Sequence, residues 1–490
     1  MANNRADLII VGALLASVAA CGSDRAAQGD AGASGAGATS VAGATSVAGG
    51  GAVSVAGGAG SAAVLDDPDP SFTDEDRTAL AGLHYDAGGP PEDVSNAVAD
   101  DPAARLFGQR LYFEPALSGV LLEGDNTGTP SNLGKKGEAG KVSCAGCHMP
   151  ASDYVDTRSP HQQISLAAQW TRRRSPTLLN IAFMPLYNWD GRRDTLWNQA
   201  IGVFESDIEF NTSRLFIAHQ IFALHRAEYE AIFGPMPNMD DSATYPPLSP
   251  LQTGCDATTA PKCHGKPGDG AEYDGMSADA QKAVTTVTVN VAKAISAYLR
   301  LLRSGASRFD SWLDGDLTAM SRSEQRGAAL FVGKGKCVSC HSGSNLSDGK
   351  FHNVGLRAAT VAVAFTDVDD RGAAEGIAAA VGDPLGSAGI FSAGDRGMLP
   401  KAVTPSMEGA FRTPMLRNLD GQPSFMHTAQ LTSLAAVVRF FDRGGDPAGF
   451  PGTNELQPLN LSDREEADLV AFLKSLEGPG ADASLRTPPP

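Results

Sequence analysis

The chain has 490 residues, of which 42% are hydrophobic, so it is long enough for two domains with ordinary cores. Its formal net charge at pH 7 is −17, which argues against binding to the phosphates of nucleic acids. The same charge suits attraction of a small basic protein, although solubility alone explains it as often.

The first residues resemble an export signal. An apolar stretch from Leu8 to Ala20 follows Arg5, and Cys21 comes directly after Val-Ala-Ala. Small residues before a cysteine are typical of a bacterial lipoprotein signal, here residues 1–21, whose cysteine becomes lipidated. We therefore expect a periplasmic protein with a lipid anchor, such as an outer-membrane lipoprotein. Ordinary cleavage that removes Cys21 or leaves it free is the alternative.

The segment after this signal is poor in residues that build a core. Residues 22–63 repeat Ala, Gly and Ser, as in GATSVAGATSVAGG, and this composition predicts a disordered tether. No later segment resembles a membrane span. A helix expected over residues 281–303 is long enough, but Asn290, Lys293 and Ser296 make it too polar.

Four of the seven cysteines form two copies of a haem-attachment pattern. The patterns are CAGCH, with Cys144, Cys147 and His148, and CVSCH, with Cys337, Cys340 and His341. Two thiols separated by two residues can add to the vinyl groups of one haem, while the next histidine reaches the iron as its proximal ligand. A single pattern also fits half a zinc site, but no further thiol pairs complete one. The sequence therefore predicts two covalently bound c-type haems.

Two further cysteines, Cys255 and Cys263, lie within CDATTAPKCHG. An oxidising compartment favours joining them in a disulfide that closes a small loop. A third haem at Cys263 and His264 is less favoured, because the two thiols have seven residues between them.

Capping patterns and apolar periodicity predict an all-α fold with few strands. One helix begins at Asp101-Pro102, and its apolar residues are Leu106, Phe107, Leu111 and Phe113. Ser321 and Glu324 form a capping box before a second helix, which carries Leu330 and Phe331 and ends at Gly333.

A third capping pattern, Ser462 with Glu465, begins a helix near the end of the sequence. Its apolar stripe consists of Leu469, Val470, Phe472, Leu473 and Leu476. We expect this stripe to pack on the helix that carries Leu330.

Residues 95–480 resemble the bacterial diheme cytochrome c peroxidases and their relative MauG, the methylamine-utilisation enzyme that oxidises a partner protein. Besides the haem patterns, the matching segments include RLYFEPALSG, RRRSPTLLNIAF, NWDGRRDTLWNQAIGVFESDIEF, FRTPMLRN and FMHTAQLTSL. The resemblance implies two cytochrome c-like domains, each with one covalent haem. Residues 95–305 would hold the peroxide-reacting haem with His148 as ligand, and residues 306–480 the electron-transfer haem with His341.

The resemblance also implies roles for three side chains at the first haem. Glu209 lies twenty residues beyond Trp189, as the family's active-site glutamate does, and Gln199 matches the glutamine between them. Glu209 is our candidate for the base that takes a proton from peroxide, and a solvated carboxylate is the alternative. Trp189 matches the tryptophan between the family's haems, where an indole can relay an electron. A core tryptophan is the plainer interpretation.

The sequence departs from the family where ligands are expected at the first haem. Ile164 replaces the distal histidine of peroxidases that need reductive activation, so we expect a five-coordinate first haem. His161 is near by count, but hydrogen bonding to solvent is the commoner fate of such a loop histidine.

The second haem lacks its expected ligand as well. Phe441 stands fourteen residues beyond His427, where the family has methionine or tyrosine, and a phenyl ring offers no lone pair to iron. Met426, Met415 and Met407 are the candidates to replace it, although loop methionines are more often core filler.

Three arginines bear on calcium binding and on the haem propionates. Arg174 stands where the family's calcium site uses asparagine, and Gln422 and Ser424 match its carbonyl donors, so the sequence leaves calcium binding open. Arg412 and Arg417, in FRTPMLRN, are candidates to pair with haem propionates or to lie exposed.

The resemblance implies an enzyme that reduces hydrogen peroxide with electrons from a small cytochrome c or copper protein. Oxidation of a residue on a partner protein, as by MauG, is the alternative. A non-catalytic electron-transfer cytochrome is the third hypothesis. Glu209 and Gln199 argue against it, because a pure carrier needs no base beside an open iron.

Overall fold

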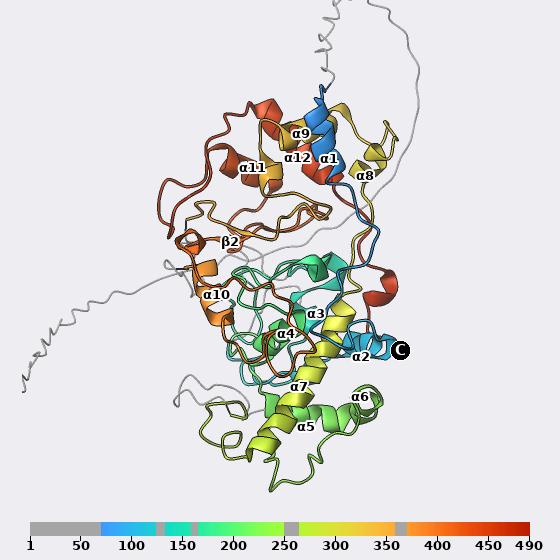
Figure 1. Cartoon of the computed structure of the whole chain (residues 1–490), viewed down its shortest axis with the longest axis vertical. Coiled ribbons are helices and arrows are strands. Elements are labelled where there is room, and N and C mark those ends of the chain that lie inside the picture. The colour runs from blue at the N-terminus through green and yellow to red at the C-terminus, as the bar shows by residue number, and fades with distance from the viewer. Residues whose placement is uncertain (1–69, 124–132, 158–164, 249–263, 358–369) are drawn as a thin grey trace, which may run out of the picture. The chain divides into compact units, whose positions relative to one another are not determined.

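The computed structural model describes residues 70–123, 133–157, 165–248, 264–357 and 370–490. Their regular secondary structure is almost entirely helical, as predicted, and long irregular segments connect the helices (Figure 1). The strands β1 (Phe351–His352) and β2 (Phe411–Arg412) form one short antiparallel pair. The short 3-10 helices are η1 (Pro115–Leu117), η2 (Pro150–Ser152), η3 (Ile181–Phe183), η4 (Cys337–Ser339), η5 (Pro405–Met407) and η6 (Ala483–Leu485).

Several sequence-based predictions lie outside the described residues. They are the signal with Cys21, the tether over residues 22–63, the disulfide between Cys255 and Cys263, and the interpretation of His161 and Ile164. Within the described ranges, no helix combines the length and apolar character needed to cross a membrane.

The long helix α7 (Ala278–Leu299) is the centre of a first hydrophobic cluster. It packs against α2 (Pro102–Tyr112), α4 (Leu196–Phe204) and α5 (Arg214–Leu224), and α6 (Arg226–Phe233) packs on α2 and α5. Members of this first cluster include Phe107, Leu111, Tyr112, Tyr154, Phe204, Leu215, Phe216 and Tyr298. The cluster is built mainly from residues between 107 and 302.

The structure corrects the predicted limits of α7 and the predicted burial of one residue of α2. The α7 helix spans Ala278–Leu299 rather than the predicted 281–303. It begins earlier because Ser277 caps it by accepting a hydrogen bond from the backbone N–H of Ala280, and it ends earlier, with Arg300 as its C-cap. In α2, Asp101 is the N-cap as predicted, but Leu106 is 51% exposed rather than part of the core. Gly108 in α2 allows close packing on α7, since a Cβ there would lie 1.8 Å from a backbone oxygen of α7.

A second hydrophobic cluster forms around α9 (Arg322–Val332) and α12 (Asp463–Ser475), which pack along each other (Figure 1). The helices α1 (Asp74–Ala81), α8 (Arg308–Leu313) and α11 (Leu434–Asp442) surround them. Members of this second cluster include Leu80, Leu83, Phe309, Phe331, Val438, Leu469, Phe472 and Leu476. Both predicted capping boxes are present, at the starts of α9 and α12.

The predicted packing of α12 on α9 is confirmed. The rings of Phe331 and Phe472 have centroids 5.1 Å apart, and Gly327 of α9 allows the close approach because a Cβ there would lie 2.0 Å from the Asp468 carbonyl oxygen. Most residues of the second cluster lie between positions 309 and 476. The division of the chain into two domains at residue 305 stays a prediction.

Segments at both ends of the described chain cross between the clusters. The α1 helix belongs to the second cluster, but the following segment reaches the first half of the fold, where Ser95 Oγ accepts a hydrogen bond from Trp197 Nε1 at 3.1 Å. After α12, the chain returns to the first cluster. There the Leu485 carbonyl oxygen accepts a hydrogen bond from Tyr298 Oη at 2.6 Å, and that of Ser484 accepts one from Gln109 Nε2 at 2.7 Å.

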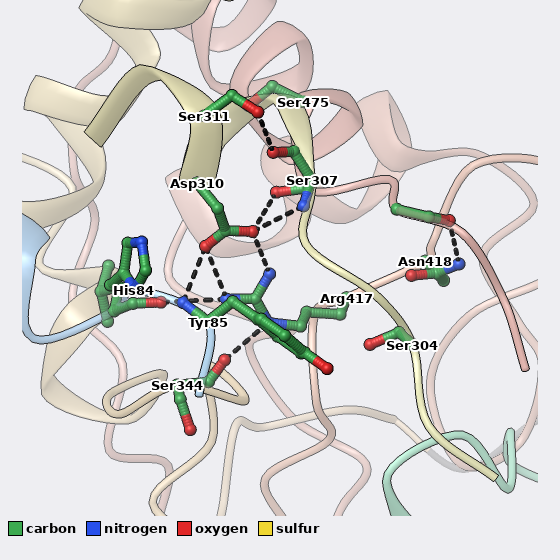
Figure 2. Close-up of polar contacts among 12 residues, drawn as sticks. His84, Tyr85, Ser304, Ser307, Asp310, Ser311, Ser344, Arg417, Asn418 and Ser475 are labelled. Carbon is green, nitrogen blue, oxygen red and sulfur yellow. Dashed lines mark hydrogen bonds and ion pairs between the residues drawn. The ribbon is translucent and has the colours of Figure 1, made fainter. Parts of the chain in front are cut away.

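A buried ion pair joins three parts of the second half of the fold (Figure 2). The side chains of Asp310 and Arg417 are 0% and 1% exposed, and Arg417 Nη1 lies 2.8 Å from Asp310 Oδ2. Arg417 also donates to the carbonyl oxygens of Leu83, at 3.1 Å, and Ser344, at 2.6 Å. The pair thus ties the segment after α1 and the loop after the second haem motif to α8.

Candidate active site

A cavity of ≈ 340 Å³ brings together the side chains that the sequence assigned to the first haem. His148, Trp189, Gln199 and Glu209 all line it. They come from the end of the first haem motif, the NWDGR loop, α4 and the segment after α4. Their proposed roles stay predictions, but their convergence on one cavity is what those roles require.

The first haem motif forms the short helix α3 (Cys144–Cys147), followed by His148. His148 Nδ1 lies 3.0 Å from the Pro176 carbonyl oxygen and 3.2 Å from that of Tyr154, so Nδ1 carries the proton and donates. Burial lowers the pKa of His148 and favours the neutral ring. A neutral imidazole with a fixed Nδ1–H presents the lone pair of Nε2, as a metal ligand needs.

The sequence analysis did not single out Tyr112, which also fixes this histidine. Its hydroxyl donates a hydrogen bond to the backbone carbonyl of His148, and its ring is fully buried in the first cluster. The available signal was its place in RLYFEPALSG, one of the segments that match the family.

The thiols of this motif do not resemble those of a disulfide oxidoreductase. Burial raises the pKa of Cys144 to about 12, whereas a redox-active pair in this spacing has a lowered pKa. Cys144 and Cys147 both pack beside the first cluster. Their environment fits thioether attachment better than thiolate chemistry.

Glu209 lies in a setting suited to proton transfer. Burial raises the pKa of its carboxyl above the ordinary value, and the positive charges of Arg192 and Arg193 oppose that rise. Gln199 lies on the same side of α4 as Val203, and both line the cavity with Glu209. The arrangement offers a carboxyl that can accept and return a proton inside the cavity.

Trp189 is 7% exposed and is held at both its side chain and its backbone. Its indole Nε1–H donates to the Arg174 carbonyl oxygen at 2.7 Å, and its own carbonyl oxygen accepts from the Arg412 backbone N–H at 2.8 Å. The ring centroid of His427 lies 6.3 Å from that of Trp189, and His427 stacks on Phe411 at 3.5 Å. Trp189 therefore lies between the cavity and aromatic residues of the second half of the chain.

The next residues of the NWDGR loop explain how Trp189 is held. Asp190 is buried between Arg173, at 2.5 Å, and Arg192, at 3.2 Å. Gly191 has a φ of 74°, and a Cβ there would lie 2.4 Å from the ring of Phe351. The loop needs glycine at this position because of both its backbone conformation and its close contact.

The helix α10 (Ala373–Ala380) forms part of the cavity wall, and the sequence analysis did not predict this contribution. Glu375, Gly376 and Ala379 line the cavity. Gly376 lies directly against the NWDGR loop, since a Cβ there would be 2.1 Å from the Asp190 carbonyl oxygen.

The second haem motif has a similar arrangement. His341 Nδ1 lies 2.9 Å from the Leu346 carbonyl oxygen, which again leaves Nε2 for a metal. Cys337 packs beside the second cluster, and Cys340 is half-buried. Arg417 donates to a carbonyl in the loop that follows, so it holds this loop through its backbone.

The candidate ligands for the second haem fall in different environments. Phe441 lies on α11 and is half-buried. Met426 packs beside the second cluster, Met415 is buried in the first cluster, and Met407 packs near α10. Met426 is thus the candidate that shares its cluster with Cys337.

Arg174 occupies the position where the family's calcium ligand was expected. Its Nη2 donates to Gln422 Oε1 at 2.7 Å, and its backbone N–H donates to the His427 carbonyl oxygen at 2.8 Å. The two positions that the sequence analysis matched to one calcium site are therefore joined directly by a hydrogen bond.

Residues 102–318 match the family model for di-haem cytochrome c peroxidases. The resemblance to the diheme cytochrome c peroxidases is confirmed. The methylamine utilization protein MauG of Methylorubrum extorquens is 29% identical over 81% of this chain and 84% of the relative. The cytochrome c551 peroxidase of Pseudomonas aeruginosa is 24% identical over 76% of this chain and 78% of the relative.

Solved structures show the same fold. The diheme peroxidase BthA from Burkholderia thailandensis superposes with a TM-score of 0.53 at 20% identity, over 77% of this chain and 86% of that structure. A MauG-like protein associated with microbial copper homeostasis superposes with a TM-score of 0.52 at 21% identity, over 83% of this chain and 97% of that structure.

Proposed function

We propose that this diheme-peroxidase relative is an enzyme that reduces hydrogen peroxide with electrons from a small redox protein, a cytochrome c or a copper protein. The convergence of His148, Trp189, Gln199 and Glu209 on one cavity carries this proposal. A metal ligand, a half-buried carboxyl and an indole in one cavity offer binding, proton transfer and electron transfer together.

The residues at each motif fit a covalently attached haem. At the first motif, the neutral His148 lines the cavity and presents Nε2, and Cys144 and Cys147 pack beside the first cluster. When bound, each haem supplies an iron that exchanges electrons with peroxide or with a donor. Arg412 adds to the fit, because its Nη1 is buried without an acceptor among the described residues.

The chain's own residues then have separate tasks. Glu209 takes a proton from the peroxide oxygen that is bound in the cavity and returns it to the oxygen that leaves as water. Gln199 orients the peroxide beside it. Trp189, fixed through its Nε1–H and its carbonyl, provides a path for electrons that arrive from the second haem motif.

MauG-like oxidation of a residue on a partner protein is the second candidate. The MauG of Methylorubrum extorquens is 29% identical over 81% of this chain, and the expected five-coordinate first haem also favours this branch. A non-catalytic electron-transfer cytochrome is the third hypothesis, which the presence of Glu209 and Gln199 in the same cavity as His148 disfavours, because a pure carrier needs no base there.

Stopped-flow spectroscopy tests the three candidates in one experiment. The protein is mixed with hydrogen peroxide, and reduced cytochrome c is then added. Rapid turnover that consumes the cytochrome supports the peroxidase. A long-lived oxidised state that does not react with the donor supports oxidation of a partner protein. If the protein does not react with peroxide at all, the result supports the non-catalytic electron-transfer cytochrome.

We also propose that the Arg174 guanidinium takes the place of a calcium ion. Its hydrogen bond to Gln422 joins the positions where the ion was expected, and its positive charge replaces that of the ion. Metal analysis of the purified protein should therefore find no stoichiometric calcium, and tightly held calcium would contradict this.

Three further features belong to the proposal. They are a lipid anchor at Cys21 in the periplasm, a disulfide between Cys255 and Cys263, and two cytochrome c-like domains over residues 95–305 and 306–480. The signal sequence, the cysteine spacing and the two haem motifs support them. Mass spectrometry of the unreduced protein should detect the lipid and no free alkylatable thiol at Cys255 or Cys263.

A further inference from the structure

Two buried arginines flank Trp189 in the wall of the cavity. Arg174 and Arg412 both line the cavity and are 5% and 3% exposed. Trp189 holds both of them through the backbone, since its Nε1–H donates to the Arg174 carbonyl and its carbonyl accepts from the Arg412 N–H. Two segments far apart in the sequence are thus both attached to Trp189 through their backbones, and both arginines line the cavity.

Each of the two guanidinium groups has a buried N–H donor without an acceptor among the described residues. Arg412 Nε donates to the Asn188 carbonyl oxygen at 3.2 Å, but its buried Nη1 has no acceptor within the described ranges. Arg174 Nη2 donates to Gln422, but its buried Nε likewise has no acceptor there. Burial lowers the pKa of each guanidinium to about 10, so both remain charged at neutral pH.

Other buried arginines of this protein are paired with carboxylates. Arg214 lies 2.6 Å from Glu205, and Arg417 lies 2.8 Å from Asp310. Among the described residues, no carboxylate acts on Arg412, and the one that acts on Arg174 is Asp156, through its charge and without a hydrogen bond to the guanidinium. A buried charge without a hydrogen-bonded counter-charge is strongly unfavourable, so these two groups call for an anionic ligand.

We propose that Arg174 and Arg412 form a carboxylate-binding pair beside Trp189, and that its ligand is the two propionates of the haem attached at Cys144 and Cys147. The planar guanidinium donates two parallel hydrogen bonds to a carboxylate, and two such groups match a ligand with two carboxylates. When the haem is attached, the two arginines would hold its carboxylates and so fix its orientation in the cavity. This inference rests on the proposed function only in that it requires a haem in the cavity.

The holoprotein tests this with Arg412→Gln, Arg174→Gln and the double variant. Arg192→Gln is the matched control, because it removes one positive charge from the same cavity wall but from an arginine already paired with Asp190. The readouts are the reduction potential of each haem and the propionate bending band in the resonance Raman spectrum.

We expect each glutamine variant to lower the potential of the first haem and to shift its propionate band, because loss of the cation favours the ferric state. The double variant should show the larger effect, Arg412→Lys should restore part of the potential, and the second haem should keep its spectrum. Changes no larger than those of Arg192→Gln would overturn the inference.

Added sodium formate distinguishes a haem carboxylate from a free one. If the propionates fill the site, formate leaves the wild-type potential unchanged. A wild-type potential that varies with formate, with no such dependence in Arg412→Gln, would assign the site to a free anion and overturn the inference. Peroxide reactivity is measured separately. An unreactive wild type with the expected shifts would refute the proposed function alone, whereas a reactive wild type without them would refute the arginine pair alone.

Discussion

Replacement of Asp310 by asparagine should destabilise the fold by about 3–5 kcal/mol, the usual cost of breaking a buried ion pair from one side. The carboxylate accepts hydrogen bonds from the Tyr85 N–H, from the N–H and hydroxyl of Ser307, and from both terminal nitrogens of Arg417. Asparagine has one acceptor oxygen, so it leaves several of these donors unpaired and the Arg417 charge uncompensated (Figure 2).

Urea unfolding, followed by circular dichroism and by the absorbance of the second haem, measures this loss. Asp314→Asn is the matched control, because Asp314 is 68% exposed and its ion pair with His84 should contribute less than about 1 kcal/mol. Replacing both Asp310 and Arg417 by neutral residues should recover part of the loss. If Asp310→Asn is no more destabilising than the control, the pair does not hold the second half together.

The same pair predicts a dependence of stability on pH. Burial opposes ionisation of Asp310, but the hydrogen bonds and charge of Arg417 outweigh it and hold the pKa below the ordinary value. A carboxyl with a lowered pKa contributes stability above its unfolded-state pKa of about 3.9 and loses it as the pH falls through the folded-state value. The stability difference between wild type and Asp310→Asn should therefore shrink in acid below about pH 4.

Four further changes have defined outcomes. Glu209→Gln should retain both haems but slow the reaction with peroxide by about 100-fold or more, whereas Glu75→Gln, at an exposed position outside the cavity lining, should leave the stopped-flow rate unchanged. Trp189→Phe should impair exchange of oxidising equivalents between the haems in rapid-mixing spectra, and normal sharing would remove it from the path. Phe441→Met should change the spin state or potential of the second haem by electron paramagnetic resonance, unless a methionine such as Met426 already ligates the iron. His225 has a raised pKa because Glu114 hydrogen-bonds to it. Its substitution by glutamine should therefore destabilise the fold more below about pH 6.5 than at alkaline pH in urea titrations.

Local chemistry explains which parts of the fold were predictable from sequence. The capping boxes at Ser321 and Ser462 involve residues three apart, so the sequence contains the whole interaction. The haem motifs are equally local, since thiol spacing and the adjacent histidine determine their chemistry. The stripe of α12 was predictable because helical periodicity places its apolar residues on one face.

Interactions between distant segments were not predictable in this way. Arg412 and Arg417 stand in one motif, yet one lines the cavity and the other pairs with Asp310, and only the fold separates them. Leu106 follows the helical pattern of α2, but no neighbouring element covers it. The contribution of α10 to the cavity depends on contact between Gly376 and a loop nearly two hundred residues earlier in the sequence.

The return of the chain from α12 to the first cluster has a consequence for the order of folding. Leu485 accepts the hydrogen bond of Tyr298, whose ring contacts that of Tyr112, and Tyr112 in turn holds His148. Synthesis proceeds from the N-terminus, so these contacts can form only after the residues of the second cluster, which extends to Leu476, have been synthesised. The residues of the first haem site are therefore synthesised early, but their packing is complete only when the segment around Leu485 is present.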